Sequence, residues 1–273
     1  MKNNLQNDNP IGVFDSGIGG LTVAHAIQQL LPNEQLLYFG DTAHLPYGDK
    51  EPHSIKQYAV EISKFLLSKN CKVIIIACHT ASSIAFEEVK KVVGNQAIVI
   101  NVIDPVVKLF ADYSFKNDNI GVIGTKGTIR SKVYPKRIKI ENDKLNVKTL
   151  ETPLLCPMIE EGFIDDKISQ TVIDSYLSNE KLNNIKHIIL ACTHYPLIKK
   201  QISSYYHDKV NVIDSAEVVA NYLVETLTTK NLLNSKPRKP HQFYVSDYTK
   251  SFEKSTRFFF KEEIHLEKKN IWN

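Results

Sequence analysis

The stretch IIIACHT, residues 74–80, recurs in nearly the same form as IILACTH, residues 188–194. Each begins as an aliphatic run, continues with Ala-Cys and then turns polar. Such a run is typical of a buried parallel strand, and ligands of α/β proteins bind beyond the C-terminal ends of these strands. The two stretches therefore predict an α/β fold in which Cys78 and Cys192 face one ligand.

Other landmarks repeat at almost the same interval along the chain. IGV at positions 11–13 returns at positions 120–122, and VID at positions 102–104 returns at positions 212–214. Cys192 follows Cys78 at a similar interval. We expect two similar lobes, related by a pseudo-two-fold axis, with mostly parallel sheets flanked by helices and an active site in the cleft between them. Residues 1–103 plus 212–273 are expected to form the first lobe, and residues 104–211 the second.

The composition is that of an ordinary globular chain, with 42% hydrophobic and 23% charged residues in 273. No apolar stretch approaches the roughly 20 residues of a membrane span, and the N-terminus lacks an apolar signal core. We therefore expect a cytoplasmic protein without a membrane partner. The four cysteines include no Cys-x-x-Cys pair, so a disulfide framework and a zinc site are not expected.

The formal net charge of +4 lies wholly in the last segment of the chain. From Lys236 onward there are nine Lys and Arg against five Asp and Glu, an excess of 9 − 5 = +4. This segment has no nucleic-acid-binding motif and no long basic block. A solvated surface is expected, and nucleic acid is not an expected partner.

Strand and helix patterns alternate along the whole chain. Strands are expected at 11–14, 36–39, 74–76, 97–102, 120–123, 147–149, 188–190 and 210–213. Helices are expected at 21–31, before Asn70, at 81–93 and at 216–228. Residues 159–162 are expected to open or lead into another helix, and residues 243–260 to form a strand followed by a helix.

The turn DSGIGG, residues 15–20, is the strongest local motif after the cysteines. Its glycines let backbone N–H groups approach an anion at the start of the following helix. A dinucleotide site would require glycine at position 22, where this chain has Thr22, so a substrate carboxylate is the expected anion. Asp15 can accept hydrogen bonds from a substrate ammonium group, which indicates a substrate with both charges. The alternative to an anion-binding turn is a purely structural one, in which the glycines only allow the following helix to pack on the strand.

Together these residues resemble the cofactor-independent aspartate/glutamate racemases, and among them the glutamate racemases, over nearly the whole chain. The resemblance depends on FDSGIGGLTV at 14–23, GDT at 40–42, PYG at 46–48, AC-x-TAS at 77–82 and ACTHYPL at 191–197. It implies two catalytic cysteines, no cofactor, and conversion between L- and D-glutamate, which supplies bacterial peptidoglycan synthesis and thereby the cell wall and cell shape. A homodimer is the expected assembly.

The resemblance also implies the residues of the site. Cys78 would deprotonate D-glutamate with the help of Asp15, and Cys192 would deprotonate L-glutamate with the help of His194 and Glu160. Substrate contacts are implied for Asp15, Ser16, Pro46, Tyr47, Gly48, His79, Thr80, Thr193 and His194.

The chemistry explains the need for two thiols. Inversion of a carbon centre requires one base on each face, and a thiol needs only a modest fall in its pKa to supply thiolate near neutral pH. Helix N-termini near the strand ends are expected to lower the pKa of both thiols.

His79 is a departure, because the family usually has Asn there. We expect its ring either to donate to the substrate carboxylate and, if protonated, to favour the Cys78 thiolate, or to swing aside. A larger ring could also shorten the pocket toward aspartate.

The remaining candidates are assigned no role in the site. Cys71 and Cys156 are expected to be structural thiols, and His44 and His53 ordinary polar residues. Three alternatives stay open: an aspartate racemase of the same superfamily, a Cys-His hydrolase or amidotransferase, and a non-catalytic amino-acid binding module.

Overall fold

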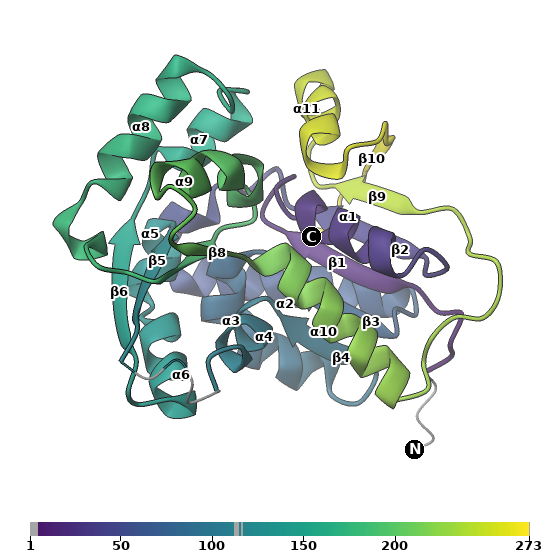
Figure 1. The fold of residues 1–273 in the computed structure, drawn as a ribbon. Helices are drawn as coiled ribbons and strands as arrows, with labels where there is room; N and C mark the ends of the chain where they lie inside the picture. Colours follow the sequence, from purple (N-terminus) through teal and green to yellow (C-terminus); the bar gives the residue numbers. More distant parts are fainter. Residues whose placement is uncertain (1–4, 112–114, 116, 273) are drawn as a thin grey trace.

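The computed structural model describes residues 5–111, 115 and 117–272, which form two parallel sheets flanked by helices (Figure 1). The larger sheet has the strand order β10-β9-β2-β1-β3-β4, and the smaller has the order β6-β5-β7-β8. The expected α/β class with parallel sheets is confirmed.

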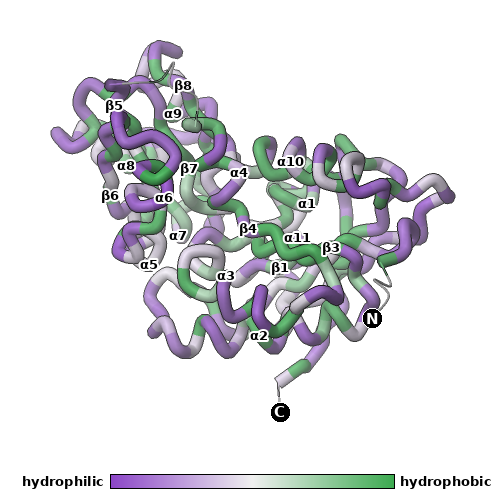
Figure 2. Tube along the Cα trace, turned by 90° about the horizontal axis from the view of Figure 1, so that it is seen from below, coloured by the Kyte–Doolittle hydropathy of each residue, from purple (hydrophilic) through white to green (hydrophobic). Residues whose placement is uncertain are grey.

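Strands β1, β3 and β7 are buried at every residue, because helices cover both faces of a parallel sheet. Figure 2 shows hydrophobic segments in the interior and hydrophilic segments along the outer loops and helix faces. The larger sheet contains β1 (Ile11–Asp15), β2 (Leu36–Gly40), β3 (Val73–Ile76), β4 (Ile98–Asn101), β9 (Gln242–Val245) and β10 (Leu266–Lys268). The smaller contains β5 (Asn119–Gly124), β6 (Asn146–Glu151), β7 (His187–Ala191) and β8 (Asn211–Asp214).

The helices include those expected at 21–31, before Asn70, at 81–93 and at 216–228, together with others that the sequence does not predict. They are α1 (Leu21–Leu30), α2 (Pro52–Ser68), α3 (His79–Val93), α4 (Ile103–Lys108), α5 (Lys126–Arg130), α6 (Val133–Glu141), α7 (Leu155–Glu160), α8 (Lys167–Leu177), α9 (Lys199–Tyr205), α10 (Ser215–Thr229) and α11 (Lys250–Phe260), with short 3₁₀ turns η1 (Tyr47–Asp49), η3 (Glu180–Leu182) and η4 (Tyr195–Ile198). Residues 159–162 contain the end of α7 rather than the start of a helix, and α8 follows. The strand and helix expected at 243–260 are β9 and α11.

The two sheets repeat one arrangement of four strands. The order β2-β1-β3-β4 of the larger sheet matches the order β6-β5-β7-β8 of the smaller. In the ladders Val73 pairs with Ile98, and His187 pairs with Asn211. Val73 corresponds to His187, and Ile98 corresponds to Asn211. The number of residues between the members of each pair is nearly the same as that between the two cysteines. The VID repeat does not follow this equivalence, because its first copy comes after β4 whereas its second lies inside β8.

Segments far apart in sequence complete the larger sheet. Strand β9 pairs with β2, and β10 pairs with β9. The expected lobe boundary at residue 212 falls inside β8, which pairs with β7 in the smaller sheet. Helix α10 follows β8 and packs against α1, so the chain returns to the first sheet along this helix.

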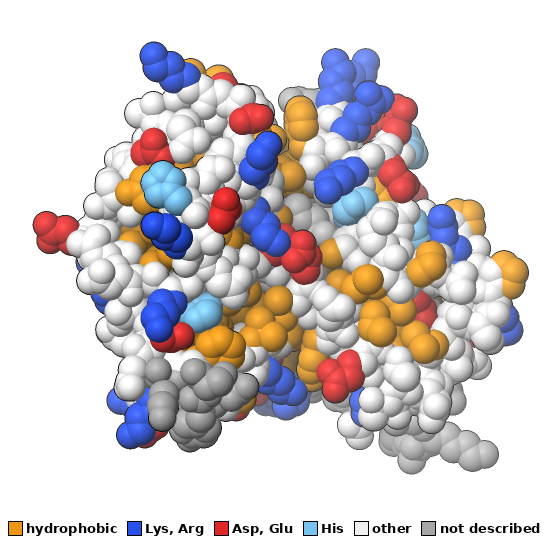
Figure 3. All heavy atoms as spheres, viewed as in Figure 1, with side chains coloured by type: hydrophobic (Ala, Val, Ile, Leu, Met, Phe, Trp, Pro, Cys, Tyr) orange, Lys and Arg blue, Asp and Glu red, His pale blue; other side chains and the backbone are white. Residues whose placement is uncertain are grey.

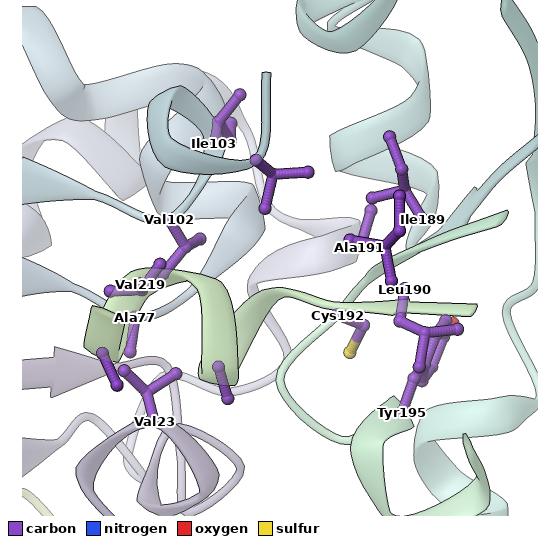
Figure 4. Close-up of a cluster of buried hydrophobic side chains, with 14 of the residues drawn as sticks. Val23, Ala77, Val102, Ile103, Ile189, Leu190, Ala191, Cys192, Tyr195 and Val219 are labelled. Carbon is purple, nitrogen blue, oxygen red and sulfur yellow. The ribbon is translucent and has the colours of Figure 1, made fainter. Parts of the chain in front are cut away.

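A hydrophobic core continues from one sheet to the other. Figure 4 shows apolar side chains of both halves, with Val23 and Ala77 on one side and Ile189 and Ala191 on the other. Cys192 lies between them at the end of β7. The two lobes therefore pack together beside the two strand ends that carry cysteines.

The surface has no single dominant charge on the face that Figure 3 shows, where basic and acidic side chains are interspersed and basic ones gather over α11. Among the described residues, no helix combines the length and apolar character needed to cross a membrane.

Candidate active site

A cavity of about 310 Å³ lies between the two lobes and is lined by both cysteines of the repeated stretches. Its volume is at the lower end of the range for small-molecule sites. Eleven of the residues expected in the site line it: Ser16, Pro46, Tyr47, Gly48, Cys78, His79, Thr80, Glu160, Cys192, Thr193 and His194. Asp15 is fully buried and is not among the residues that line the cavity.

Cys78 follows β3 and is the N-cap of α3. Its Sγ accepts a hydrogen bond from the backbone N–H of Ala81 at 3.5 Å and lies 3.6 Å from Oγ of Ser16. The Ala81 bond is the expected contribution of a helix N-terminus. Burial and the nearby carboxylate of Asp15 outweigh it and raise the pKa of Cys78 to about 12. The expected lowering of this pKa is therefore wrong.

The glycine-rich turn after β1 encloses the carboxylate of Asp15. The backbone N–H of Gly17 donates to Oδ2 of Asp15 at 3.1 Å, and the N–H groups of Ser16 and Gly20 also favour the ionised form. Burial nevertheless raises the pKa of Asp15. These N–H groups stabilise the Asp15 carboxylate, and the substrate carboxylate expected at this turn stays a prediction.

Cys192, His194 and Glu160 form a connected chain on the second lobe. Sγ of Cys192 is 3.6 Å from Nδ1 of His194, and Nε2 of His194 is 2.9 Å from Oε1 of Glu160. Burial disfavours the imidazolium, but the hydrogen bonds with Cys192 and Glu160 outweigh burial and raise the pKa of His194 well above its usual value. Burial and Cys156 raise the pKa of Cys192 despite the opposing effect of His194.

Cys156 belongs to this cluster, and its assignment as a structural thiol outside the site is wrong. It lines the cavity, and its Sγ is 3.1 Å from Sγ of Cys192. Cys156 and Glu160 are one helical turn apart on α7, so they lie on the same face of that helix. Since Glu160 was expected in the site, helical spacing could have identified Cys156. Cys71 is buried among apolar residues outside the cavity, as expected.

Threonines connect the two lobes at the cavity. Oγ1 of Thr80 is 2.9 Å from Oγ1 of Thr125, which caps α5 in the second lobe. Oγ1 of Thr22 donates to the carbonyl oxygen of Thr193 at 2.9 Å. Thr125 was not among the predicted site residues, although it follows Ser16 at the same interval that separates the two copies of IGV.

His79 is buried and its ring stacks on that of Tyr134, with 6.3 Å between centroids. Neither ring nitrogen has a hydrogen-bond partner among the described residues. Burial lowers the pKa of His79 to about 3. The ring is therefore neutral at physiological pH, and the idea that its positive charge favours the Cys78 thiolate is wrong.

Comparison with known proteins assigns the chain to a family. A model of the Asp/Glu/Hydantoin racemase family matches residues 11–223, most of the chain. The chain belongs to this racemase family. The glutamate racemase of Chlorobaculum parvum is 43% identical over 262 residues, which are 95% of each chain.

Solved structures of this racemase family agree. The glutamate racemase from Francisella tularensis, determined in complex with D-glutamate, is 38% identical, with a TM-score of 0.89 over 97% of this chain and 98% of that chain. The glutamate racemase from Thermus thermophilus is 34% identical, with a TM-score of 0.86 over 97% of this chain and 98% of that one. The resemblance inferred from the sequence is confirmed.

Proposed function

We propose that this chain is a glutamate racemase that moves a proton between Cys78, Cys192 and the Cα atom of glutamate. One observation carries the proposal: the two thiols line a single cavity from opposite lobes. Inversion through a planar carbanion needs a base on one face and an acid on the other. Two thiols on opposite lobes meet that requirement without a cofactor.

The proposed reaction exchanges the protonation states of the two sulfurs. The Cys192 thiolate removes the Cα proton of L-glutamate, and the Cys78 thiol gives its proton to the opposite face. D-glutamate then leaves with Cys192 protonated and Cys78 ionised. The reverse reaction begins with the Cys78 thiolate and restores the first state.

Each thiol can act as a base only as a thiolate, and a nearby positive charge is needed to stabilise that form. Burial raises the pKa of both thiols, so a thiolate without positive charge beside it is unfavourable in this cavity. His194, whose pKa is raised by Cys192 and Glu160, supplies an imidazolium beside Cys192. On the first lobe, the ammonium group of bound substrate would compensate the charges of Asp15 and the Cys78 thiolate.

Polar groups around the cavity would hold the two substrate carboxylates. Hydroxyl groups of Ser16, Thr80 and Thr193 line it, together with the Tyr47–Gly48 segment. The Tyr47 hydroxyl donates to Oδ2 of Asp41 at 2.6 Å, which fixes the ring and leaves the neighbouring backbone as the contact surface. We expect Pro46 to shape this wall.

We place the enzyme in the cytoplasm as a homodimer that provides D-glutamate for peptidoglycan synthesis. Two-fold dimers are the commonest assembly of soluble chains. Light scattering during size-exclusion chromatography tests the dimer, and a monomer mass would contradict it.

Incubation with L-glutamate in heavy water tests the activity. We expect D-glutamate carrying deuterium at Cα, and finally equal amounts of the two enantiomers. Unchanged L-glutamate without exchange at Cα would instead indicate a binding module. Release of ammonia from L-glutamine would indicate an amidotransferase. A parallel reaction with L-aspartate tests the aspartate racemase alternative, because an aspartate racemase would racemise L-aspartate in preference to L-glutamate.

A further inference from the structure

Three metal-ligating side chains meet at one end of the cavity. The sulfurs of Cys156 and Cys192 and Nδ1 of His194 lie within 4.8 Å of one another. Cys192 and His194 are buried, and Cys156 is partly exposed to the cavity. The racemase reaction uses Cys192 and His194 but gives no role to Cys156, so a third thiol at 3.1 Å from a base needs a separate explanation.

The separation of Cys192 and His194 matches what a tetrahedral zinc ion requires, and that of the two sulfurs is shorter. Zn–S bonds of about 2.3 Å and Zn–N bonds of about 2.0 Å place two sulfurs about 3.8 Å apart and a sulfur and a nitrogen about 3.5 Å apart. The separation of Cys192 Sγ and His194 Nδ1 is 3.6 Å. The two sulfurs must separate by about 0.7 Å, a shift that rotation of the partly exposed Cys156 can provide.

Glu160 completes the arrangement around His194. Metal-bound histidines usually donate their other ring N–H to a carboxylate, which fixes the ring and its tautomer. Nε2 of His194 is 2.9 Å from Oε1 of Glu160, so Nδ1 is directed to the two sulfurs. Cys156 and Glu160 share one face of α7, opposite Cys192 and His194 respectively.

We propose that Cys156, Cys192 and His194 bind a thiophilic divalent cation, with zinc as the representative ion, and that this ion inhibits the enzyme. Binding joins the metal to both sulfurs and to Nδ1, and the thiol protons and the Nδ1 proton of the His194 imidazolium pass to solvent. The fourth position faces the cavity and takes water or a substrate oxygen. A metal-bound Cys192 cannot remove the Cα proton, so inhibition follows from the loss of one base. The inference goes beyond racemisation, because a two-base reaction requires neither Cys156 nor a metal.

Cobalt and zinc titrations of the purified protein test the site without reference to activity. Under anaerobic conditions, Co²⁺ is expected to produce the intense near-ultraviolet thiolate-to-cobalt absorption of a tetrahedral site, and one equivalent of Zn²⁺ to remove it. Cys156→Val replaces the thiol by a slightly larger apolar side chain that cannot bind a metal, and should weaken zinc binding about a hundredfold. Cys71→Ala, at a buried thiol outside the cavity, is the matched control and should bind zinc as the unchanged protein does.

Activity measurements give the second part of the test. Zn²⁺ is expected to inhibit the wild-type enzyme, EDTA to restore it, and Mg²⁺ to have no effect because it prefers oxygen ligands. Equal zinc affinity of the wild type and Cys156→Val, or no cobalt–thiolate absorption, would overturn the proposal. Recovery with a reductant but not with a chelator would also overturn it, because the two thiols would then have been oxidised.

Discussion

Gly19 of the first lobe lies directly against the ring of His194 in the second lobe. A Cβ atom at position 19 would be 2.4 Å from both Cε1 and Nδ1 of His194. The glycine is therefore required by close approach between the lobes. The same approach sets the position of a ring that also contacts Cys192 and Glu160.

Gly19→Ala should reduce kcat/KM about a hundredfold with little loss of fold, because displacement of a catalytic group by about 1 Å can have that effect. Gly17→Ala is the matched comparison in the same turn. Its Cβ would meet only Leu45 at 3.7 Å, an ordinary contact, and it should retain much more activity. Circular dichroism checks the fold and steady-state kinetics check the activity. Equal effects of the two substitutions would contradict the role of the Gly19–His194 contact.

Cys78→Ser and Cys192→Ser should each reduce racemisation about 100- to 10,000-fold, since each removes one general base. The two variants are expected to differ in direction. Cys78→Ser weakens the base that deprotonates D-glutamate, so it should increase the isotope effect measured with α-deuterated D-glutamate. Cys192→Ser should increase the isotope effect measured with α-deuterated L-glutamate. Full activity in either variant would refute the two-base assignment, and reversed isotope effects would exchange the two roles.

Glu160→Gln should move the alkaline limb of the pH–kcat/KM profile to lower pH. The hydrogen bonds with Cys192 and Glu160 raise the pKa of His194 and keep its ring protonated to higher pH. Removal of the Glu160 charge lowers that pKa, so the imidazolium is lost earlier as the pH rises. Because Glu160 is partly exposed, we expect about a tenfold loss of kcat/KM. An unchanged alkaline limb would show that the ring is not used in its charged form.

His79→Asn should leave the shape of the pH profile between pH 6 and 9 unchanged. Burial lowers the pKa of His79 to about 3, so the ring is neutral throughout this range and carries no titrating charge to lose. Activity should stay within about tenfold, since Asn also offers an N–H donor. His79→Leu, without a donor, should be slower than His79→Asn if the ring holds a substrate carboxylate. A shifted acid limb in His79→Asn would contradict the neutral ring.

The strands and the two cysteines could be predicted because their signals are local. Aliphatic runs such as 74–76 and 188–190 become β3 and β7, and the polar residues after them mark the ends of these strands at the cavity. Cys156 could not be found in this way, since it lies on a short helix with no strand pattern before it. The direction of the thiol pKa shifts was also not predictable. The direction of these shifts depends on how completely the two lobes together exclude water from the thiols. A sequence motif within one lobe does not show how the other lobe covers it.

The position of β9 has a consequence for synthesis on the ribosome. Its partner β2 is made early, whereas Gln242, the ladder partner of Leu37, comes near the end of the chain. Chains emerge with the N-terminus first, so this edge of β2 stays unpaired while the entire second sheet is translated. An exposed strand edge invites association with other chains. The nascent protein consequently has a long interval in which a chaperone can protect it.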